Sequence, residues 1–204
     1  MSFYLVEELE QGSDQWLAWR QGVIGASDAP IIMGDNPWSS PEYLIKRKLG
    51  VVEEFQGNAK TIEGKELEGK ARVNLERKFK LKLSPVVVQD SREPFLAASL
   101  DGISKNYKKV FEIKSGAKAY EYTEQTGEVN NYYYAQLQHT LMVTEIEYIT
   151  YALYRPGKKL LTLKIQRNDT YIKKLRKQEK EFVKQLSAAG HEIQYQFVGR
   201  LVNN

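Results

Sequence analysis

Residues 99–114, with the sequence SLDGISKNYKKVFEIK, decide the fold. Apolar runs at 95–100 and 110–114 predict two β-strands, and the polar, lysine-rich stretch between them predicts a turn. If the chain turns between Asn106 and Tyr107, the two strands pair as an antiparallel hairpin. The sequence therefore predicts that this hairpin forms part of a sheet.

The predicted hairpin places two carboxylates face to face. In this register Asp101 lies opposite Glu112, with the two Cα atoms about 5 Å apart. Side chains two residues apart share a face of a strand, so Lys114 projects beside Glu112, whereas Ile113 points into the core. Facing acids repel each other unless a proton or a cation lies between them.

Hard divalent cations such as Mg²⁺ prefer carboxylate oxygens, and this chain has no cysteine to indicate a softer metal. The acid pair therefore predicts a magnesium site, with Lys114 placed to contact water or a phosphate oxygen. The alternative is an ordinary surface hairpin that carries a Glu–Lys pair, because Glu-x-Lys alone is a common tripeptide.

The segments around the hairpin predict an α/β or α+β fold, in which helices flank a central mixed sheet. Helices are expected at 13–22, from Ser27 or Asp28 over a short stretch, and at 40–50, 61–80, 131–143 and 169–190. Further strands are expected at 86–88, 148–154 and 159–165. No repeat or linker interrupts the chain, so we expect a single domain over residues 1–204.

Composition excludes several kinds of site. The absence of cysteine excludes disulfides, thiolate zinc sites, iron–sulfur clusters and thiol catalysis. The two histidines argue against a histidine-based centre, and we expect His139 on a helix surface or at an interface. A net charge of +4 favours an acidic partner such as nucleic acid. Much of this excess lies in 173–184, which also fits the solvated face of one helix.

The sequence favours a cytoplasmic protein with no membrane partner. Its first residues, MSFYLVEELEQ, carry acids early and lack the pattern of a signal peptide. No apolar run approaches the roughly 20 residues of a transmembrane helix.

Four stretches together resemble the lambda exonuclease and YqaJ-type phage recombinase branch of the PD-(D/E)XK nuclease superfamily. They are WLAWRQGVIGASDA at 16–29, EGKELEGKAR at 63–72, SLDGISKNYKKVFEIK at 99–114 and YYYAQLQHTLMVT at 132–144. Each motif alone is weak, but the four occur in the family's order and at similar intervals. The resemblance implies a core like that of restriction endonucleases.

The resemblance implies a metal site on the hairpin. Asp101, Glu112 and the backbone carbonyl of Ile113 would bind one ion. Lys114 would orient or activate the attacking water and stabilise charge on the phosphate. Two Mg²⁺ ions are expected, with Mn²⁺ as a possible substitute. The family often has Pro where this chain has Leu100, and Cys-Pro where it has Ser115-Gly116; neither change removes a ligand.

A helix acid binds the second metal in these enzymes, and among Glu63, Glu66 and Glu68 the motif selects Glu68. The alternative role of Glu68 is an i,i+4 salt bridge to Arg72. Gln136 matches an active-site glutamine of the family, although, taken alone, a solvated helix position explains it better.

Arg20 and Ser27 match positions that hold a 5′-phosphate. A guanidinium forks onto phosphate, and a serine at a helix start adds a hydroxyl and free backbone amides. The alternatives are a surface arginine and a plain N-cap.

The implied activity is a Mg²⁺-dependent 5′→3′ exodeoxyribonuclease. It would degrade one strand of linear double-stranded DNA from a 5′-phosphorylated end, giving mononucleotides and a 3′ single-stranded overhang. The implied partners are double-stranded DNA ends, two further copies in a homotrimeric ring and a single-strand annealing protein, in a phage or prophage of a bacterial host. The alternatives are an endonuclease on the same fold and a non-catalytic DNA-binding recombination scaffold.

Overall fold

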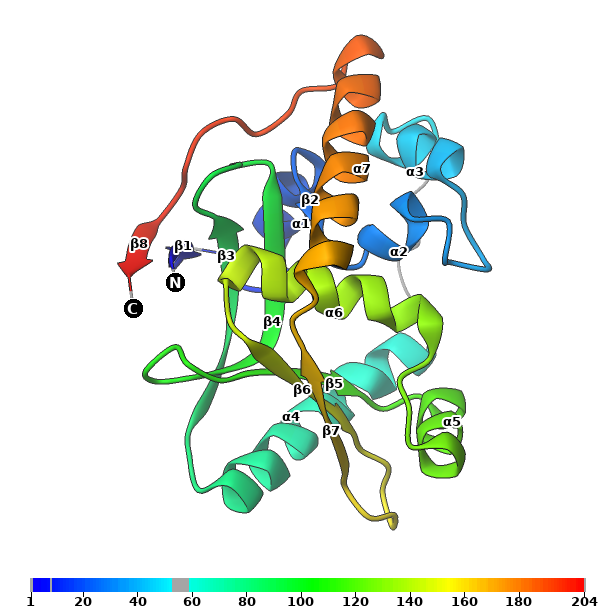
Figure 1. The fold of residues 1–204 in the computed structure, drawn as a ribbon, viewed down its shortest axis with the longest axis vertical. Helices are drawn as coiled ribbons and strands as arrows, with labels where there is room; N and C mark the ends of the chain where they lie inside the picture. The colour runs from blue at the N-terminus through cyan, green and yellow to red at the C-terminus, as the bar shows by residue number, and fades with distance from the viewer. Residues whose placement is uncertain (1, 8, 53–58, 204) are drawn as a thin grey trace.

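The computed structural model describes residues 2–7, 9–52 and 59–203, and in this part of the chain helices flank a mixed eight-stranded sheet (Figure 1). The strands are β1 (Ser2–Val6), β2 (Ile24–Gly25), β3 (Leu83–Asp90), β4 (Leu96–Ser104), β5 (Val110–Lys114), β6 (Tyr148–Leu153), β7 (Leu161–Gln166) and β8 (Arg200–Asn203). The helices are α1 (Asp14–Gln21), α2 (Ala29–Ile32), α3 (Pro41–Lys48), α4 (Ala59–Phe79), α5 (Ala117–Thr126), α6 (Asn131–Thr144) and α7 (Asp169–Ala188). The predicted α/β class with a mixed central sheet is confirmed.

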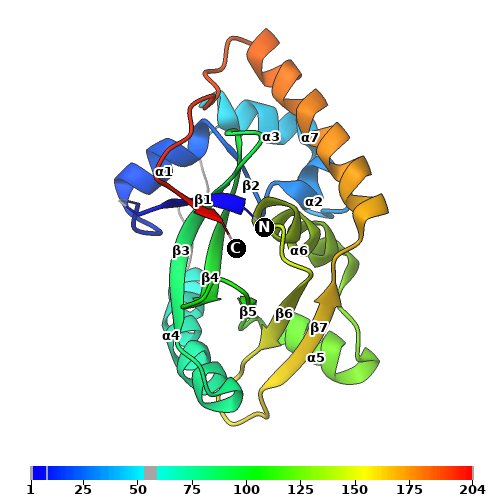
Figure 2. The ribbon, with the colours of Figure 1, turned by 60° about the vertical axis from the view of Figure 1, so that its left-hand side comes forward.

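The strands lie in the order β7-β6-β5-β4-β3-β1-β8, and the short strand β2 pairs with β4. The β5–β6 and β2–β4 pairs are parallel, and the other neighbours are antiparallel. A parallel pair needs a crossover connection, which α5 and α6 supply between β5 and β6. Figure 2 shows α4 and α6 on opposite sides of β3 and β4, so the centre of the sheet is shielded from water on both faces.

The central hairpin has the predicted register. Gly102 pairs with Phe111 and Ile103 with Val110, and one further step along the strands places Asp101 opposite Glu112. The turn is centred between Asn106 and Tyr107, as predicted. The acid pair of the sequence analysis is therefore a feature of the fold.

A β-bulge lies where β4 carries Asp101. The pairing of β3 with β4 shifts between Ser84↔Ile103 and Val86↔Leu100, which leaves Pro85 opposite the two residues Asp101 and Gly102. Proline tolerates such a position because it has no N–H to contribute to the ladder. A bulge bends its strand and re-aims the side chain it carries, which accounts for Asp101 pointing toward the backbone of β5.

Four elements escaped the sequence-based prediction. Strands β1 and β8 pair with each other from opposite ends of the chain, and β2 has only two residues. Helix α5 has Gly116 at its N-cap, which forms no side-chain capping hydrogen bond. Strand β3 begins before Pro85 rather than after it. No helix in the described ranges is long and apolar enough to cross a membrane.

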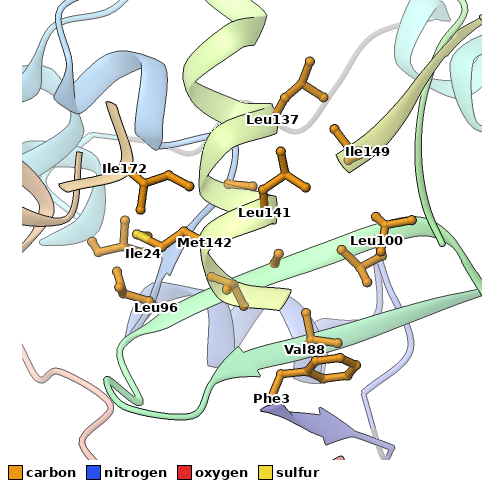
Figure 3. Close-up of a cluster of buried hydrophobic side chains, with 14 of the residues drawn as sticks. Phe3, Ile24, Val88, Leu96, Leu100, Leu137, Leu141, Met142, Ile149 and Ile172 are labelled. Atoms are coloured by element: carbon orange, nitrogen blue, oxygen red, sulfur yellow. The ribbon is translucent and has the colours of Figure 1, made fainter. Parts of the chain in front are cut away.

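The largest core cluster forms where α6 packs on the sheet (Figure 3). Leu137, Leu141 and Met142 of α6 are fully buried against side chains from the strands, among them Leu100 of β4. Every residue of α6 from 137 to 144 is buried. Burial is not confined to the side of α6 that faces the sheet, because α7 also packs against this helix.

His139 illustrates this coverage, since its expected position on a surface or at an interface was wrong. The imidazole is completely buried. Its Nδ1 lies 2.6 Å from a carboxylate oxygen of Glu179 on α7, and its Nε2 lies 2.9 Å from the carbonyl oxygen of Ala97 on β4. Burial lowers the pKa of His139, but the Glu179 carboxylate outweighs that effect and raises it.

We expect Glu179→Gln to destabilise the protein by about 1–3 kcal/mol, because it removes the charge from a buried pair but keeps an acceptor. Because the pKa of His139 is raised in the folded state, its ion pair stabilises the fold fully below the unfolded pKa of 6.5. This stabilisation is lost as pH rises through the folded pKa. Thermal unfolding should show a gap between wild type and variant of about 2–4 °C per kcal/mol that narrows above neutral pH. A gap independent of pH would contradict this pairing. The matched control is Glu181→Gln, on the exposed face of the same helix.

Candidate active site

All eight residues that the sequence nominated line one cleft of about 570 Å³. Its walls come from α1, the β2–α2 loop, α4, β4, β5 and α6. The nominated residues are Arg20, Ser27, Glu68, Asp101, Glu112, Ile113, Lys114 and Gln136. Residues more than 100 positions apart in the chain thus share one concave surface.

Glu112 is the hub of the polar contacts in the cleft. Its side chain is buried, and one carboxylate oxygen lies 2.8 Å from Nζ of Lys114. The same oxygen accepts a hydrogen bond of 2.6 Å from Nε2 of Gln136. The side chain of Gln136 is therefore engaged in the cleft, and its hydrogen bond links α6 to β5.

Asp101 is held in a different way. Its Oδ2 accepts a 2.7 Å hydrogen bond from the backbone N–H of Ile113. Burial and the neighbouring charge of Glu112 raise the pKa of Asp101 well above its usual range. The negative charge of the Asp101 carboxylate is thus not fully compensated by the protein, and an incompletely compensated carboxylate attracts a cation.

Lys114 keeps its proton although burial lowers its pKa. The carboxylates of Glu112 and Asp101 outweigh the burial and raise the pKa of Lys114 well above its usual range. The ammonium also lies 4.8 Å from the ring centroid of Tyr133, which supports the charge through a cation–π contact. The cleft therefore presents a fixed positive charge beside its acids.

The alternative role predicted for Glu68, the ion pair, is present, and the residue also lies in the cleft. Glu68 forms the i,i+4 ion pair with Arg72 and still lines the cleft. Burial raises the pKa of Glu68, Arg72 opposes this, and the charge of Glu112 adds to the rise. Arg72 also donates a 2.8 Å hydrogen bond from Nε to the carbonyl oxygen of Asp101. Glu66 is exposed, and the side chain of Glu63 lies outside the described residues.

The other glutamine of α6, Gln138, points away from the cleft. Nε2 of Gln138 donates to the carbonyl oxygen of Gln166 at 2.9 Å. Its Oε1 accepts from the backbone N–H of Asn168, also at 2.9 Å. Gln138 therefore fixes α6 to the β7–α7 junction, and only Gln136 serves the cleft.

Arg20 and Ser27 meet at another wall of the cleft, where the guanidinium donates to the Ser27 hydroxyl. The guanidinium lies 4.8 Å from the ring centroid of Trp16, whose Nε1 donates to Ser99 Oγ at 3.0 Å. Asp28, not Ser27, occupies the N-cap of α2. The plain N-cap explanation of Ser27 was therefore wrong, because its hydroxyl faces Arg20.

Sequence reasoning missed the ionic support behind this wall. Asp28 is buried and contacts Arg47 at 2.8 Å and Lys48 at 3.1 Å. Burial raises the pKa of Asp28, but Lys48 and Arg20 outweigh it and lower the pKa to about 2. Nζ of Lys48 also donates to the carbonyl oxygen of Arg20 at 2.9 Å. The wall is thus anchored by buried charges that no spacing in the sequence reveals.

Trp16, Ser99 and Tyr133 were also missed as lining residues. A sequence signal existed for two of them. Ser99 lies two positions before Asp101 on β4, and Tyr133 lies three positions before Gln136 on α6, so both share a face with a nominated residue.

The predicted metal ligands contact protein groups in this structure. Within the described residues, no three aspartate, glutamate or histidine side chains form a group that could hold a metal ion as they stand. Asp101 contacts the Ile113 amide, Glu112 contacts Lys114 and Gln136, and Glu68 contacts Arg72. The metal site therefore stays a prediction.

Comparison with known proteins gives a consistent picture. The YqaJ-like viral recombinase domain matches residues 15–147. The chain is 31% identical over 190 residues to the uncharacterized protein YqaJ of Bacillus subtilis, an alignment that covers 87% of this chain and 57% of that protein. The chain thus spans little more than half the length of this relative.

Solved structures share the fold. An alkaline exonuclease from Laribacter hongkongensis superimposes with a TM-score of 0.75 at 22% identity, covering 87% of this chain and 94% of that one. The structure of the same enzyme in complex with dAMP matches equally well. A phage-related exonuclease from Haemophilus somnus gives a TM-score of 0.57 at 16% identity, over 82% and 96% of the two chains.

The segment matched by the recombinase domain contains every nominated residue of the cleft. All four motifs on which the resemblance rested also lie within residues 15–147. The chain belongs to the YqaJ-like viral recombinase family.

Proposed function

We propose that this protein is a metal-dependent 5′→3′ exodeoxyribonuclease that degrades one strand of linear double-stranded DNA from a 5′-phosphorylated end. The observation that carries the proposal is the convergence of the acids, Lys114, Arg20 and Ser27 in one cleft. The shared fold with two exonucleases agrees with it. The proposal places hydrolysis at one wall and end recognition at another.

The donor set suits a hard cation. Three carboxylates, from Glu68, Asp101 and Glu112, line the cleft together with the backbone of Ile113. Glu68 and Asp101 have raised pKa values, and the charge of Glu112 contributes to both rises. Carboxylate and carbonyl oxygens are the ligands that Mg²⁺ prefers, and Mn²⁺ accepts them also. We assign Asp101, Glu112 and the Ile113 carbonyl to one ion and Glu68 to a second.

Bound magnesium would supply Lewis-acid activation of water and neutralise charge on the phosphodiester. The chain's own contribution begins with Lys114, whose ammonium offsets negative charge that develops on the phosphate. Glu112 and Tyr133 hold this ammonium in place. Gln136 orients the carboxylate of Glu112 through its hydrogen bond.

Arg20 and Ser27 would give the reaction its direction. A guanidinium can form two parallel hydrogen bonds to a phosphate, and the Ser27 hydroxyl lies within its reach. A terminal 5′-phosphate carries more charge than an internal phosphodiester, so it gains more from this wall. Capture of the end in the same cleft as the acids would place the cut a fixed length from the 5′ end.

The biological setting follows from the family. A viral recombinase domain fits a phage or prophage protein that works in the cytoplasm of a bacterial host. We propose that the 3′ overhang is passed to a single-strand annealing protein, and that three copies form a ring around the DNA. Sedimentation of the purified protein with and without duplex tests the ring, for which a monomer under both conditions is the contrary result.

The test of end recognition compares linear duplexes with 5′-phosphate and 5′-hydroxyl ends, in Mg²⁺ or EDTA. Wild type should release mononucleotides only with Mg²⁺ and should prefer the phosphorylated end. Arg20→Ala should lose this preference by about 10- to 150-fold in kcat/KM, the range for one charge-assisted contact worth about 1.5–3 kcal/mol. Arg77→Ala, which removes an exposed arginine of α4, is the matched control.

Three outcomes separate the alternatives. Loss of end preference in Arg20→Ala with residual hydrolysis supports the proposal. Strong cutting of covalently closed circles by wild type indicates an endonuclease. DNA binding without hydrolysis in any divalent metal indicates a scaffold.

A further inference from the structure

Trp38 is the most exposed large hydrophobic side chain among the described residues, with 70% of its surface accessible. It lies between α2 and α3, on a loop that projects from the molecule in Figure 1. Its indole meets the ring of Tyr132 edge to face, with centroids 5.0 Å apart. Exposure of an indole has a hydrophobic cost, which a contact with another molecule would offset.

The Trp38–Tyr132 pair continues an aromatic series that starts in the cleft. Tyr133 lines the cleft and lies beneath the Lys114 ammonium. The rings of Tyr133 and Tyr132 are 4.2 Å apart, and Tyr132 then meets Trp38. Aromatic faces therefore lead from the reactive lysine to the exterior.

The backbone holds the outer rings in place. The N–H of Trp38 donates to Oδ1 of Asn36 at 2.8 Å, which closes a local turn. Asn36 and Asp35 both donate backbone N–H groups to the carbonyl oxygen of Pro30, at 3.0 and 2.8 Å. The Asp35 carboxylate is engaged by the hydroxyl of Tyr171 at 3.2 Å. The one acid in this turn is thus tied to α7.

We propose that Trp38 and Tyr132 form a stacking platform for an unpaired nucleobase at the end of the DNA duplex. The inference rests on the proposed function, because it needs a DNA end at the cleft. Only one strand of a duplex can enter a cleft that measures its cut from a 5′ end, so bases at the end must separate. Every nucleobase has a π-face. Replacing an aromatic side chain that stacks on a base with alanine costs about 1–3 kcal/mol of binding free energy.

A nucleobase fits this surface better than a protein segment does. The platform adjoins Tyr133, which lines the cleft that also contains the cations Lys114 and Arg20, and these cations suit the phosphates on either side of a stacked base. The platform itself presents aromatic rings, packed edge to face, and no free acid among the residues described above. Stacking would therefore offset the cost of unpairing the end and hold it open beside the acids.

The test is a double-mutant cycle on binding, measured in EDTA so that hydrolysis plays no part. A fluorescent duplex with a 5′-phosphate is compared with duplexes that carry a single abasic site at each of the first four positions of either strand. Wild type should lose affinity about 5-fold or more at one position at least, the lower limit for one stacked base. Trp38→Ala should bind the intact duplex at least about 5-fold more weakly than wild type does. An abasic site at the sensitive position should not weaken its binding further.

Trp38→Phe should restore most of the coupling because it keeps an aromatic face. Tyr195→Ala removes another exposed aromatic residue, 61% accessible, and should leave both affinities unchanged. Equal sensitivity of wild type and Trp38→Ala to every abasic site overturns the proposal, as does an absence of DNA binding. Coupling between Trp38→Ala and an abasic site, without Mg²⁺-dependent hydrolysis, would support the platform and refute the nuclease. Mg²⁺-dependent hydrolysis without this coupling would support the nuclease and refute the platform.

Discussion

Lys114→Ala is expected to lower kcat for DNA hydrolysis by about 10²–10³-fold, the usual effect of removing one preorganised group that stabilises developing charge. The ammonium is fixed by Glu112 at 2.8 Å and by the ring of Tyr133. Because it is positioned before substrate arrives, its field needs no reorganisation during the reaction. The loss should appear in kcat rather than KM, since the charge it stabilises grows in the transition state.

Lys164→Ala is the matched control for this prediction. Lys164 also lies over a tyrosine ring, 4.0 Å from the centroid of Tyr148, but it is an exposed residue of β7. This variant should hydrolyse DNA at the wild-type rate. A Lys114→Ala enzyme with kcat within a few fold of wild type would remove Lys114 from the mechanism.

Asp101→Asn is expected to abolish hydrolysis and, without metal, to stabilise the fold. Burial and the charge of Glu112 raise the pKa of Asp101, so its ionised form is disfavoured in the folded state. Asparagine keeps an acceptor for the Ile113 amide and removes the repulsion. In wild type, ionisation of Asp101 lowers the free energy of unfolding. This loss is absent below the unfolded pKa of 3.8 and grows as pH rises toward the folded pKa.

Thermal unfolding in EDTA measures this effect, with about 2–4 °C expected for each kcal/mol of relief. The variant should match wild type near pH 4 and unfold at a higher temperature near neutral pH. Added Mg²⁺ should then raise the Tm of wild type but not that of the variant, because a ligand stabilises only the protein that binds it. Equal responses of the two proteins to Mg²⁺ would place the metal elsewhere.

Asp90→Asn provides the contrasting control. Asp90 is also buried, but its carboxylate contacts Arg176 at 2.9 Å and accepts the backbone N–H groups of Arg92 and Glu93. Its negative charge is therefore compensated. The same substitution should lower the Tm at Asp90 and raise it at Asp101.

The sequence predicted the hairpin and its register because local rules determine them. Alternating side chains and a polar turn are sufficient to place Asp101 opposite Glu112. The bulge that re-aims Asp101 could not be predicted, because it depends on Pro85 in the neighbouring strand. The sequence nominated Glu68 and also its i,i+4 partner Arg72, but it could not show that Glu68 pairs with Arg72 and lines the cleft at the same time.

The remaining failures share one cause, which is contact between distant segments. The burial of His139 depends on α7, 40 residues later in the chain. The pairing of β1 with β8 joins the two ends of the described chain. The support that Asp28 gives to the wall formed by Arg20 and Ser27 needs Arg47 and Lys48 from α3. No single segment contains the information for these contacts.

The measurement that tests the central claim most directly is the digestion by wild type of linear and covalently closed duplex DNA, with Mg²⁺ or EDTA. The account predicts that mononucleotides are released from the linear DNA only, that Mg²⁺ is required, and that a 3′ single-stranded tail remains. Absence of hydrolysis with any divalent metal, or cutting of closed circles as fast as linear DNA, would contradict it.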